Sequence, residues 1–355
     1  MNSLFADDPY RRSPMLGGGS PPVEGVQRTS FADYQPQRRM MLFAGRSNAA
    51  LSGRIADELG FELGLCKLKT FANGEHYVRL GESVRGADVF LMQSCSNPVN
   101  DNLFELLLMI NAARLASAKR ITAVLPWFPY ARQDKKSAPR EPIAARLVAD
   151  MLEVAGADRV LTMDLHAGQV QGFFRVPVVH MTALPMFAQY FRDRGLPAED
   201  LVVVSPDAGR AKLAGKFAEM LGVDLAVLNK VRPEHNSARV STVIGEVRGK
   251  VCIISDDMID TAGTLVAGAQ AIRDAGATRV FACATHGVFS APALERIAGS
   301  VLEQVVVCDT IPIDPTTKPA NVHVLSVAGI LAETIRNVFT DDSVSAIFKG
   351  ENQLF

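Results

Sequence analysis

The chain has 355 residues, of which 48% are hydrophobic and 21% charged, values typical of a globular protein with about two domains. Lys and Arg total 37 against 38 Asp and Glu, and this net charge of −1 argues against electrostatic binding to nucleic acid or to a membrane surface. Five widely spaced cysteines without a CxxC pair predict reduced thiols, no zinc site and a cytoplasmic location. No apolar run approaches the roughly 20 residues of a membrane-spanning helix.

The first segment, residues 1–39, contains the glycine- and proline-rich stretch Gly17–Pro22 and no periodic apolar pattern. Such a segment cannot bury enough apolar surface to offset the entropy lost on ordering, so we expect a disordered tail. The segment lacks the apolar run of a secretory signal, and its acidic residues fit a transit peptide poorly. Targeting by this tail is the alternative to the cytoplasmic expectation.

From Met40 onward, short apolar runs of β type alternate with stretches of helical periodicity. The expected strands are Met41–Ala44, Val89–Met92, Ile121–Leu125, Arg159–Thr162, Leu201–Val204, Leu225–Leu228, Val251–Ile254, Val280–Cys283 and Gln304–Val307. The expected helices are Asn102–Ala116, Pro142–Val154, Arg210–Leu221, Thr261–Asp274 and Val327–Val338. Continuous apolar strands that alternate with helices predict an α/β fold with mainly parallel sheets flanked by helices.

The segment Met181–Pro185 separates two blocks with the same order of strands and helices, which suggests a duplication. We expect an N-terminal domain at residues 40–185 and a C-terminal domain at residues 186–336. The last segment, residues 337–355, is expected to pack on the N-terminal domain.

Polar residues that can bind a nucleotide occur twice in the first block. Phe71 offers a stacking face, Asn73 and Glu75 offer hydrogen bonds, and Gly74 allows a tight turn, although Asn-Gly turns are common in proteins without a ligand there. Arg132, followed by Gln133, comes after an apolar strand and can bind phosphate with two hydrogen bonds. A solvated basic surface, continued by Lys135 and Lys136, is the alternative.

Two further residues follow expected strands. His166 comes after the strand at 159–162, where its imidazole would lie in the crevice at the carboxyl end of a parallel sheet. A single histidine is nevertheless more often structural than a ligand. Asp207 follows the strand at 201–204 and either serves the same crevice or caps the next helix.

Lys230 and Arg232 lead into the polar segment Pro233–Ser237, which has no apolar anchor. We expect a mobile loop here, and its cations are of the kind that a lid closing over polyphosphate would use. Loop cations are, however, usually just solvated.

The sharpest local pattern is the apolar strand at 251–254 followed by Asp256, Asp257 and the segment Asp260–Thr264 at the start of a helix. Backbone N–H groups at a helix N-terminus, with the hydroxyls of Thr261 and Thr264, can stabilise an incoming phosphate. The acidic pair can bind sugar hydroxyls or a metal ion. An ordinary helix cap beside solvated carboxylates is the alternative.

Together these motifs resemble the ribose-phosphate diphosphokinase family, and the resemblance runs in order from Met41 to Phe348. It rests on the segments Phe71–Glu75, Glu82–Gly86, Phe128–Lys136, Asp164–Ala167, Gln171–Phe174, Ser205–Gly209 and Ser255–Thr264. The resemblance implies two tandem type I phosphoribosyltransferase-like domains. It also implies transfer of the diphosphoryl group of MgATP to the 1-hydroxyl of ribose 5-phosphate, with release of AMP.

The roles of individual residues are carried over from the family onto matching positions. The resemblance implies ATP binding by Phe71, Asn73, Gly74, Glu75, Arg132 and Gln133; ribose 5-phosphate binding by Arg232, Asp256, Asp257, Asp260, Thr261, Ala262, Gly263 and Thr264; Mg²⁺ ligation by His166 and Asp207; and catalysis by Lys230 and Arg232. It also implies a homohexamer, with phosphate and ADP as allosteric effectors that bind near Lys135–Arg140 and Ser343–Ser345.

The chain departs from the family pattern at a few positions. Arg175 replaces an aspartate near a segment used for subunit contacts, and Arg210 stands where many members have a second glycine. A base phosphoribosyltransferase would share only the loop at 256–264. A non-catalytic regulatory subunit would be expected to lose Lys230, Arg232, His166 or Asp207, and all four are present.

Overall fold

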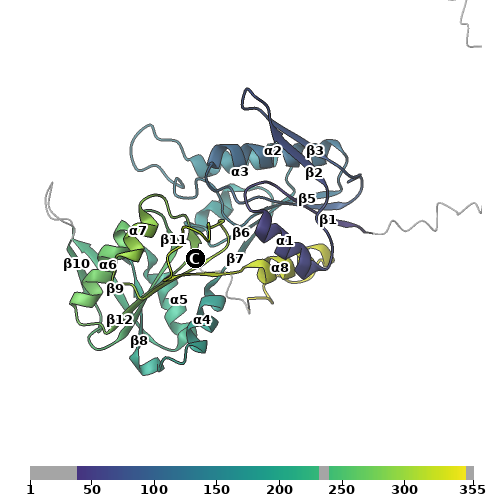
Figure 1. The fold of residues 1–355 in the computed structure, drawn as a ribbon. Coiled ribbons are helices and arrows are strands. Elements are labelled where there is room, and N and C mark those ends of the chain that lie inside the picture. Colours follow the sequence, from purple (N-terminus) through teal and green to yellow (C-terminus); the bar gives the residue numbers. More distant parts are fainter. Residues whose placement is uncertain (1–37, 232–239, 349–355) are drawn as a thin grey trace, which may run out of the picture. The chain divides into compact units, whose positions relative to one another are not determined.

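The computed structural model describes residues 38–231 and 240–348, which belong to one compact unit. This part of the chain forms one parallel sheet and one mainly parallel sheet, both flanked by helices, and one small hairpin (Figure 1). The α/β class predicted from the alternating apolar runs is therefore confirmed. No helix within the described ranges is both long and apolar enough to cross a membrane.

The first sheet has five parallel strands in the order β1-β4-β5-β6-β7. Its strands are β1 (Met40–Ala44), β4 (Asp88–Met92), β5 (Arg120–Leu125), β6 (Arg159–Met163) and β7 (Val178–Met181). The helices in this half of the chain are α1 (Ala49–Leu59), α2 (Val99–Leu115), α3 (Ala144–Ala155) and α4 (Leu184–Asp193), of which α4 packs on α5 (Ala211–Leu221) of the next half. The start of α1 is fixed by Asn48, whose side chain accepts a hydrogen bond from the Leu51 N–H, and its end by Gly60 at φ 77°.

The second sheet has seven strands in the order β10-β9-β8-β11-β12-β13-β14, and only β10 runs antiparallel to its neighbour. Its strands are β8 (Leu201–Ser205), β9 (Asp224–Val231), β10 (Val240–Ile244), β11 (Val251–Ile259), β12 (Arg279–Gly287), β13 (Gln304–Cys308) and β14 (Val322–Leu325). The helices in this half of the chain are α5 (Ala211–Leu221), α6 (Gly263–Asp274), α7 (Ala293–Ala298) and α8 (Ala328–Thr340), of which α8 packs on α1. Short 3₁₀ turns occupy Gly168–Phe173, Ala198–Asp200 and Ala208–Arg210.

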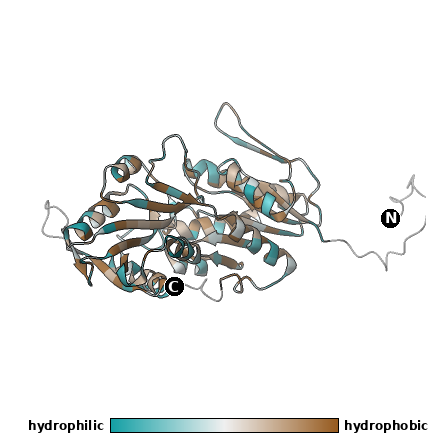
Figure 2. Ribbon diagram, turned by 60° about the horizontal axis from the view of Figure 1, so that its bottom comes forward, coloured by the Kyte–Doolittle hydropathy of each residue, from teal (hydrophilic) through white to brown (hydrophobic). Residues whose placement is uncertain are grey.

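Apolar side chains divide among three clusters according to the alternation of the strands. Leu42 faces one cluster while Met41 and Phe43 face another, as the two-residue period of a strand requires. The cluster around Leu42 also contains Phe281 and Leu331 from the second half of the chain, so both sheets contribute to one core. Figure 2 shows hydrophobic strands between helices whose outer surfaces are more hydrophilic.

Strands β2 (Cys66–Thr70) and β3 (His76–Leu80) form an antiparallel hairpin. Figures 1 and 2 both show this hairpin standing out from the first sheet, and β3 packs against α2. Neither strand carries a continuous apolar run, and the strands expected from the sequence were all based on such runs, so none was expected at 66–80. The alternation in Cys66–Thr70 is the period-two pattern of a half-exposed strand.

Every strand and helix expected from the sequence is present, with ends shifted by a few residues. Helices α1, α4 and α7 were not expected. Helix α4 occupies the segment interpreted as the boundary between two blocks, and Pro185 in its first turn is a helix-start signal. The division into domains at residues 40–185 and 186–336 itself stays a prediction.

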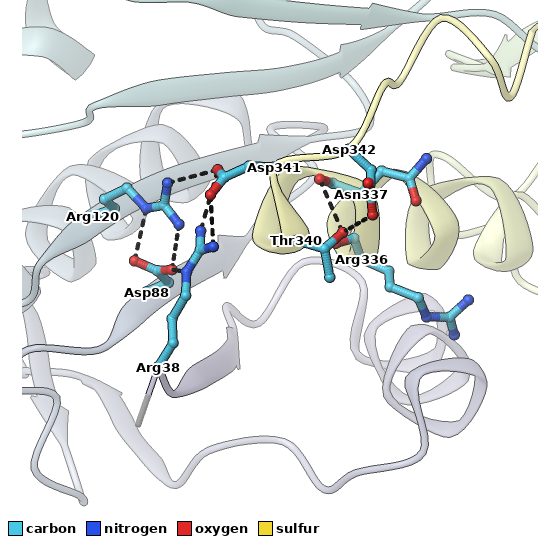
Figure 3. A network of polar contacts seen from close by, with 8 residues as sticks. All are labelled: Arg38, Asp88, Arg120, Arg336, Asn337, Thr340, Asp341 and Asp342. Atoms are coloured by element: carbon cyan, nitrogen blue, oxygen red, sulfur yellow. Dashed lines mark hydrogen bonds and ion pairs between the residues drawn. The ribbon is translucent and has the colours of Figure 1, made fainter. Parts of the chain in front are cut away.

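Two arginines and two aspartates join the beginning of the described chain to its last helix (Figure 3). Asp88, with a side chain 3% exposed, lies 2.7 Å from Arg38 Nε and 2.6 Å from Arg120 Nη2. Asp341, 60% exposed, contacts Nη1 of the same two arginines at 2.7 and 3.0 Å. Arg38 and Arg39 fall inside the expected tail, whose residues 1–37 lie outside the described ranges, as do residues 349–355.

Candidate active site

A cavity of about 330 Å³ lies at the carboxyl ends of β8 and β11 and at the first turn of α6. Crevices of this kind are where ligands bind in parallel α/β sheets. Side chains from both halves of the chain line it: Arg132, His166, Pro206, Asp207, Arg210, Asp256, Asp257 and the segment Met258–Leu265, with Cys283. Most residues predicted to bind ribose phosphate or metal are thus brought together here.

The turn before α6 forms one wall of this cavity. Ala262 adopts a left-handed conformation with φ 59° directly before Gly263, the first helical residue. Arg296 Nη1 donates a 2.9 Å hydrogen bond to the Thr261 carbonyl and so holds the turn from outside. The first N–H groups of a helix have no acceptor within the helix and point toward its N-terminus. The turn therefore offers backbone donors to an anion.

Four charged or polar side chains meet beneath this turn. Asp257, with a side chain 2% exposed, lies 2.8 Å from His166 Nδ1 and 2.6 Å from Arg210 Nη2. Arg210 Nη2 also lies 2.6 Å from His166 Nδ1, and Arg210 Nε lies 3.8 Å from Asp256 Oδ1. The guanidinium of Arg210 is thus surrounded by two carboxylates and an imidazole.

The two neighbouring carboxyl groups have opposite pKa shifts. Burial raises the pKa of Asp256 well above its ordinary value, and the adjacent charge of Asp257 adds to the rise. Burial alone would also raise the pKa of Asp257. Contact with His166 and the charge of Arg210 outweigh that effect and lower this pKa to about 2. Asp257 is therefore the permanent negative charge of the pair.

Asp207 begins the 3₁₀ turn before α5, and its carboxylate accepts a 3.1 Å hydrogen bond from the Arg210 N–H. The capping role weighed against a ligand role is thus observed, and the carboxylate still lines the cavity. Among the described residues, no three His, Cys, Asp or Glu side chains converge on one point that could hold a metal ion. The carboxylate of Asp207 suits a hard divalent ion, whereas the imidazole of His166 is an unusual ligand for one, so part of the coordination would have to come from phosphate and water oxygens.

Arg132, from the first half of the chain, contacts a residue of the second half. Its Nη1 lies 2.6 Å from Asp260 Oδ2, and both side chains are partly exposed. A hydrogen bond from Ser290, followed by that from Arg132, lowers the pKa of Asp260. Arg132 also lines a second cavity of about 720 Å³, together with Gln133, Trp127 and Tyr130. The two cavities share Arg132, as a site for a nucleotide beside a sugar phosphate would require.

The segment Phe71–Glu75 lies apart from these residues, at the tip of the β2–β3 hairpin. Its backbone closes the turn through a 2.8 Å bond from the Phe71 N–H to the Glu75 carbonyl, and Gly74 has φ 92°. All five residues are exposed, and none of them lines either cavity. The ammonium group of Lys69 instead lies over the Phe71 ring, with its Nζ 4.7 Å from the ring centroid.

The two predicted catalytic cations cannot be placed as side chains. Lys230 lies on β9, with its backbone opposite Ser241 of β10. Arg232 and the segment Pro233–Ser237 lie outside the described residues. The predicted roles of Lys230 and Arg232 therefore stay predictions.

Three residues near the cavities were not assigned a function from the sequence. In the sequence, Arg210 differs from the family pattern only by standing where many members have a second glycine. That difference is the one sequence feature that points to it. Trp127 packs edge-on against His286, with ring centroids 4.8 Å apart, and no local pattern marks it. Asp164, at φ 32°, accepts hydrogen bonds from Thr285 Oγ1 at 2.6 Å and the Ala183 N–H at 2.8 Å, and so fixes the turn before His166.

Comparison with known proteins adds an independent line of argument. Residues 40–156 match the model of the N-terminal domain of ribose phosphate pyrophosphokinase. Residues 232–349 match the phosphoribosyl synthetase-associated domain. Together the two models account for more than half of the chain.

Curated relatives and a solved structure agree with these matches. A ribose-phosphate pyrophosphokinase of Fusobacterium nucleatum is 48% identical over 86% of this chain and 97% of its own length. The chloroplastic ribose-phosphate pyrophosphokinase 1 of Arabidopsis thaliana is 47% identical over 98% of this chain and 90% of its own length. The crystal structure of phosphoribosylpyrophosphate synthetase from Mycobacterium smegmatis is similar, with a TM-score of 0.82 and 48% identity over 86% of this chain and 100% of that one. This chain therefore belongs to the ribose-phosphate pyrophosphokinase family.

Proposed function

We propose that this chain transfers the diphosphoryl group of ATP to the 1-hydroxyl of ribose 5-phosphate, giving 5-phosphoribosyl 1-pyrophosphate and AMP. The observation that carries this proposal is the cavity in which Arg132 and His166, from the first half, face the Asp256–Thr264 segment of the second half. Cations that suit a polyphosphate and a helix N-terminus that suits a sugar phosphate meet in one place.

Each end of the cavity has a distinct task. The turn at Asp260–Thr264 holds the 5-phosphate through backbone N–H groups and threonine hydroxyls, while Asp256 and Asp257 accept hydrogen bonds from ribose hydroxyls. Arg132 and Gln133 bind ATP from the side of the 720 Å³ cavity. Phe71, Asn73, Gly74 and Glu75 remain proposed ATP contacts, although the hairpin tip that carries them lies outside both cavities.

The reaction needs no covalent intermediate. The O1 atom of the sugar forms a bond to the β-phosphorus, and the bond from that phosphorus to the oxygen leading to the α-phosphorus breaks. AMP leaves with that electron pair, and the hydroxyl proton passes to solvent. His166 and Asp207, together with ATP oxygens, would hold Mg²⁺, which would neutralise charge on the phosphates when bound. Lys230 and Arg232 bind the oxygens of the transferring group, on which charge accumulates.

Assembly and regulation follow the same proposal. We infer a homohexamer with phosphate and ADP as effectors, supported by the family to which the chain belongs. Size measurement with and without phosphate tests the assembly separately from the chemistry.

The decisive experiment measures AMP release by the purified chain with ATP, Mg²⁺, ribose 5-phosphate and inorganic phosphate. We expect AMP and 5-phosphoribosyl 1-pyrophosphate in equal amounts, and no AMP when the sugar is omitted. Lys230→Ala is the informative variant, and Lys67→Ala, an exposed strand lysine on the hairpin, is its matched control. A folded protein that releases no AMP would overturn the proposal.

A further inference from the structure

Arg210 is an internal cation at the place where the metal-binding side chains meet. Its side chain is only 13% exposed and lies between Asp256, Asp257 and His166. The position is fixed from the backbone side too, since the Arg210 N–H donates to the Asp207 carboxylate. The residue thus touches both proposed metal ligands.

The positive charge of Arg210 disfavours the binding of a divalent ion next to it. Asp257 is a nearly fully buried carboxylate that contacts Arg210 and His166, and of these two only Arg210 is charged when the imidazole is neutral. A buried carboxylate needs a positive partner, and a guanidinium 2.6 Å away provides one without any metal. A second cation entering the same few ångströms would be repelled by the first.

The two ring nitrogens of His166 give a second, independent reason why Arg210 and a metal ion compete. Arg210 Nη2 always carries protons, so its 2.6 Å contact with Nδ1 requires the Nδ1 lone pair as acceptor. A metal bound at Nδ1 would take that same lone pair. A metal bound at Nε2 would leave the proton on Nδ1, which would then donate to Asp257, 2.8 Å away. Metal ligation by neutral His166 therefore breaks the contact with Arg210 in either tautomer.

We propose that Arg210 is a positioning residue that competes with the divalent metal: it neutralises Asp257 and occupies His166 Nδ1 in the metal-free chain, and it must withdraw from His166 when the ion binds. This inference rests on the proposed use of His166 as a metal ligand. Its consequence is that the metal alone binds weakly, and binds well only when ATP supplies further oxygens. The arginine thereby makes metal loading depend on nucleotide.

The test measures the affinity of the chain for Mn²⁺ alone, without nucleotide or sugar, from the electron paramagnetic resonance signal of free Mn²⁺. Arg210→Met keeps most of the side-chain volume and removes the charge and the donors. We expect it to bind Mn²⁺ at least about tenfold more tightly than the unchanged chain, a difference of about 1.4 kcal/mol. Arg210→Lys keeps the charge without the planar fork and should fall between the two.

A matched control is Arg146→Met, which removes an arginine from an exposed i,i+4 ion pair with Asp150 on α3. It should bind Mn²⁺ like the unchanged chain. Equal or weaker binding by Arg210→Met would overturn the proposal, because an arginine that merely orients the ligands would lower the affinity on removal. If Arg210→Met does not fold, the Mn²⁺ affinity of Arg210→Lys decides instead: tighter binding than in the unchanged chain supports the proposal, and equal or weaker binding overturns it.

The tautomer of His166 provides a readout that a purely structural role would not move. In ¹⁵N-histidine spectra of the metal-free chain, His166, assigned with His166→Gln, should carry its proton on Nε2. In Arg210→Met the proton should move to Nδ1, where Asp257 accepts it. An unchanged tautomer would contradict the inference. Normal AMP release with no effect of Arg210→Met on Mn²⁺ binding would sink only this inference, whereas tighter Mn²⁺ binding without AMP release would sink only the proposed function.

Discussion

Arg132 and Asp260 lie 128 positions apart in the sequence, yet Nη1 of one is 2.6 Å from Oδ2 of the other. One belongs to the proposed ATP side of the active site and the other to the proposed sugar-phosphate turn. The ion pair therefore holds together two groups that have separate tasks once substrates arrive, and it must open for Arg132 to bind phosphate.

Arg132→Gln and Asp260→Asn should change the KM for ATP in opposite directions. Loss of the guanidinium removes a charge-assisted bond to phosphate and should raise this KM at least about tenfold. Asp260→Asn releases Arg132 from an exposed pair worth at most about 1 kcal/mol and should lower the KM for ATP about threefold, while raising that for ribose 5-phosphate. Steady-state kinetics with each substrate varied give the answer, and an unchanged or higher KM for ATP in Asp260→Asn would show that the pair does not restrain Arg132.

Lys230→Ala should lower kcat by about a hundredfold or more, because removing one cation from a developing oxyanion costs that much in other enzymes. The Kd for ATP should change by less than about threefold, since the lysine acts mainly in the transition state. The only tryptophan, Trp127, lines the cavity beside Arg132 and can report ATP binding by its fluorescence. Unchanged turnover in Lys230→Ala would remove the lysine from the mechanism.

The network of Figure 3 allows a prediction about stability. Asp88→Ala leaves Arg38 and Arg120 facing each other without the buried carboxylate and should cost about 3 kcal/mol. Asp341→Ala removes a carboxylate that is 60% exposed and should cost less than about 1 kcal/mol. At about 2 °C per kcal/mol for a chain of this size, Tm should fall by about 6 °C in the first variant and by about 2 °C or less in the second. Equal losses in the two variants would contradict the role assigned to burial.

Stability should also fall below about pH 6.5 because of the buried histidines. Burial lowers the pKa of His286, whose Nε2 lies 3.2 Å from the Met163 carbonyl and whose Nδ1 lies 2.9 Å from Thr310 Oγ1. Burial lowers the pKa of His180 in the same way. The unfolded chain then binds more protons than the folded chain just below the unfolded pKa of about 6.5, so stability is lost as the pH falls through that range.

The measurement is Tm at about pH 7.5 and about pH 5.5 for the unchanged chain and for His286→Asn. The decrease in Tm between the two values should be smaller in the variant, because one of the responsible groups is gone. Partial burial also lowers the pKa of His323 on β14, so His323→Asn should reduce the decrease in Tm as well. An equal decrease in His286→Asn and the unchanged chain would exclude His286 as a source of the pH dependence.

The sequence predicts most strands of the two large sheets because they are continuous buried runs, as in β4 and β8. It misses β7 and β14, which are only partly buried, and β10 at the edge of the second sheet. It fails at the β2–β3 hairpin, whose strands are half exposed and whose stability comes from packing on α2. Dependence on tertiary packing also limits how much of the site can be predicted from the sequence. The turn at Asp260–Thr264 is local and could be found, whereas the position of Arg210 depends on two other strands.

The link between Arg132 and Asp260 could not have been found from spacing, because both lie on loops and only the packing of the two sheets brings them together. The hairpin segment Phe71–Glu75 is a different case. Its residues lie on an exposed tip outside both cavities, so their role in ATP binding stays a prediction that the geometry of this chain does not test.

The packing of α8 on α1 has a consequence for how this protein is made on the ribosome. Leu51 and Ile55 of α1 share a core with Leu331 and Ile335 of α8, which are translated almost three hundred residues later. Until α8 has left the exit tunnel, the apolar face of α1 that carries Leu51 and Ile55 lacks this partner. Chains stalled or cleaved before residue 328 should therefore engage chaperones more than chains that include α8.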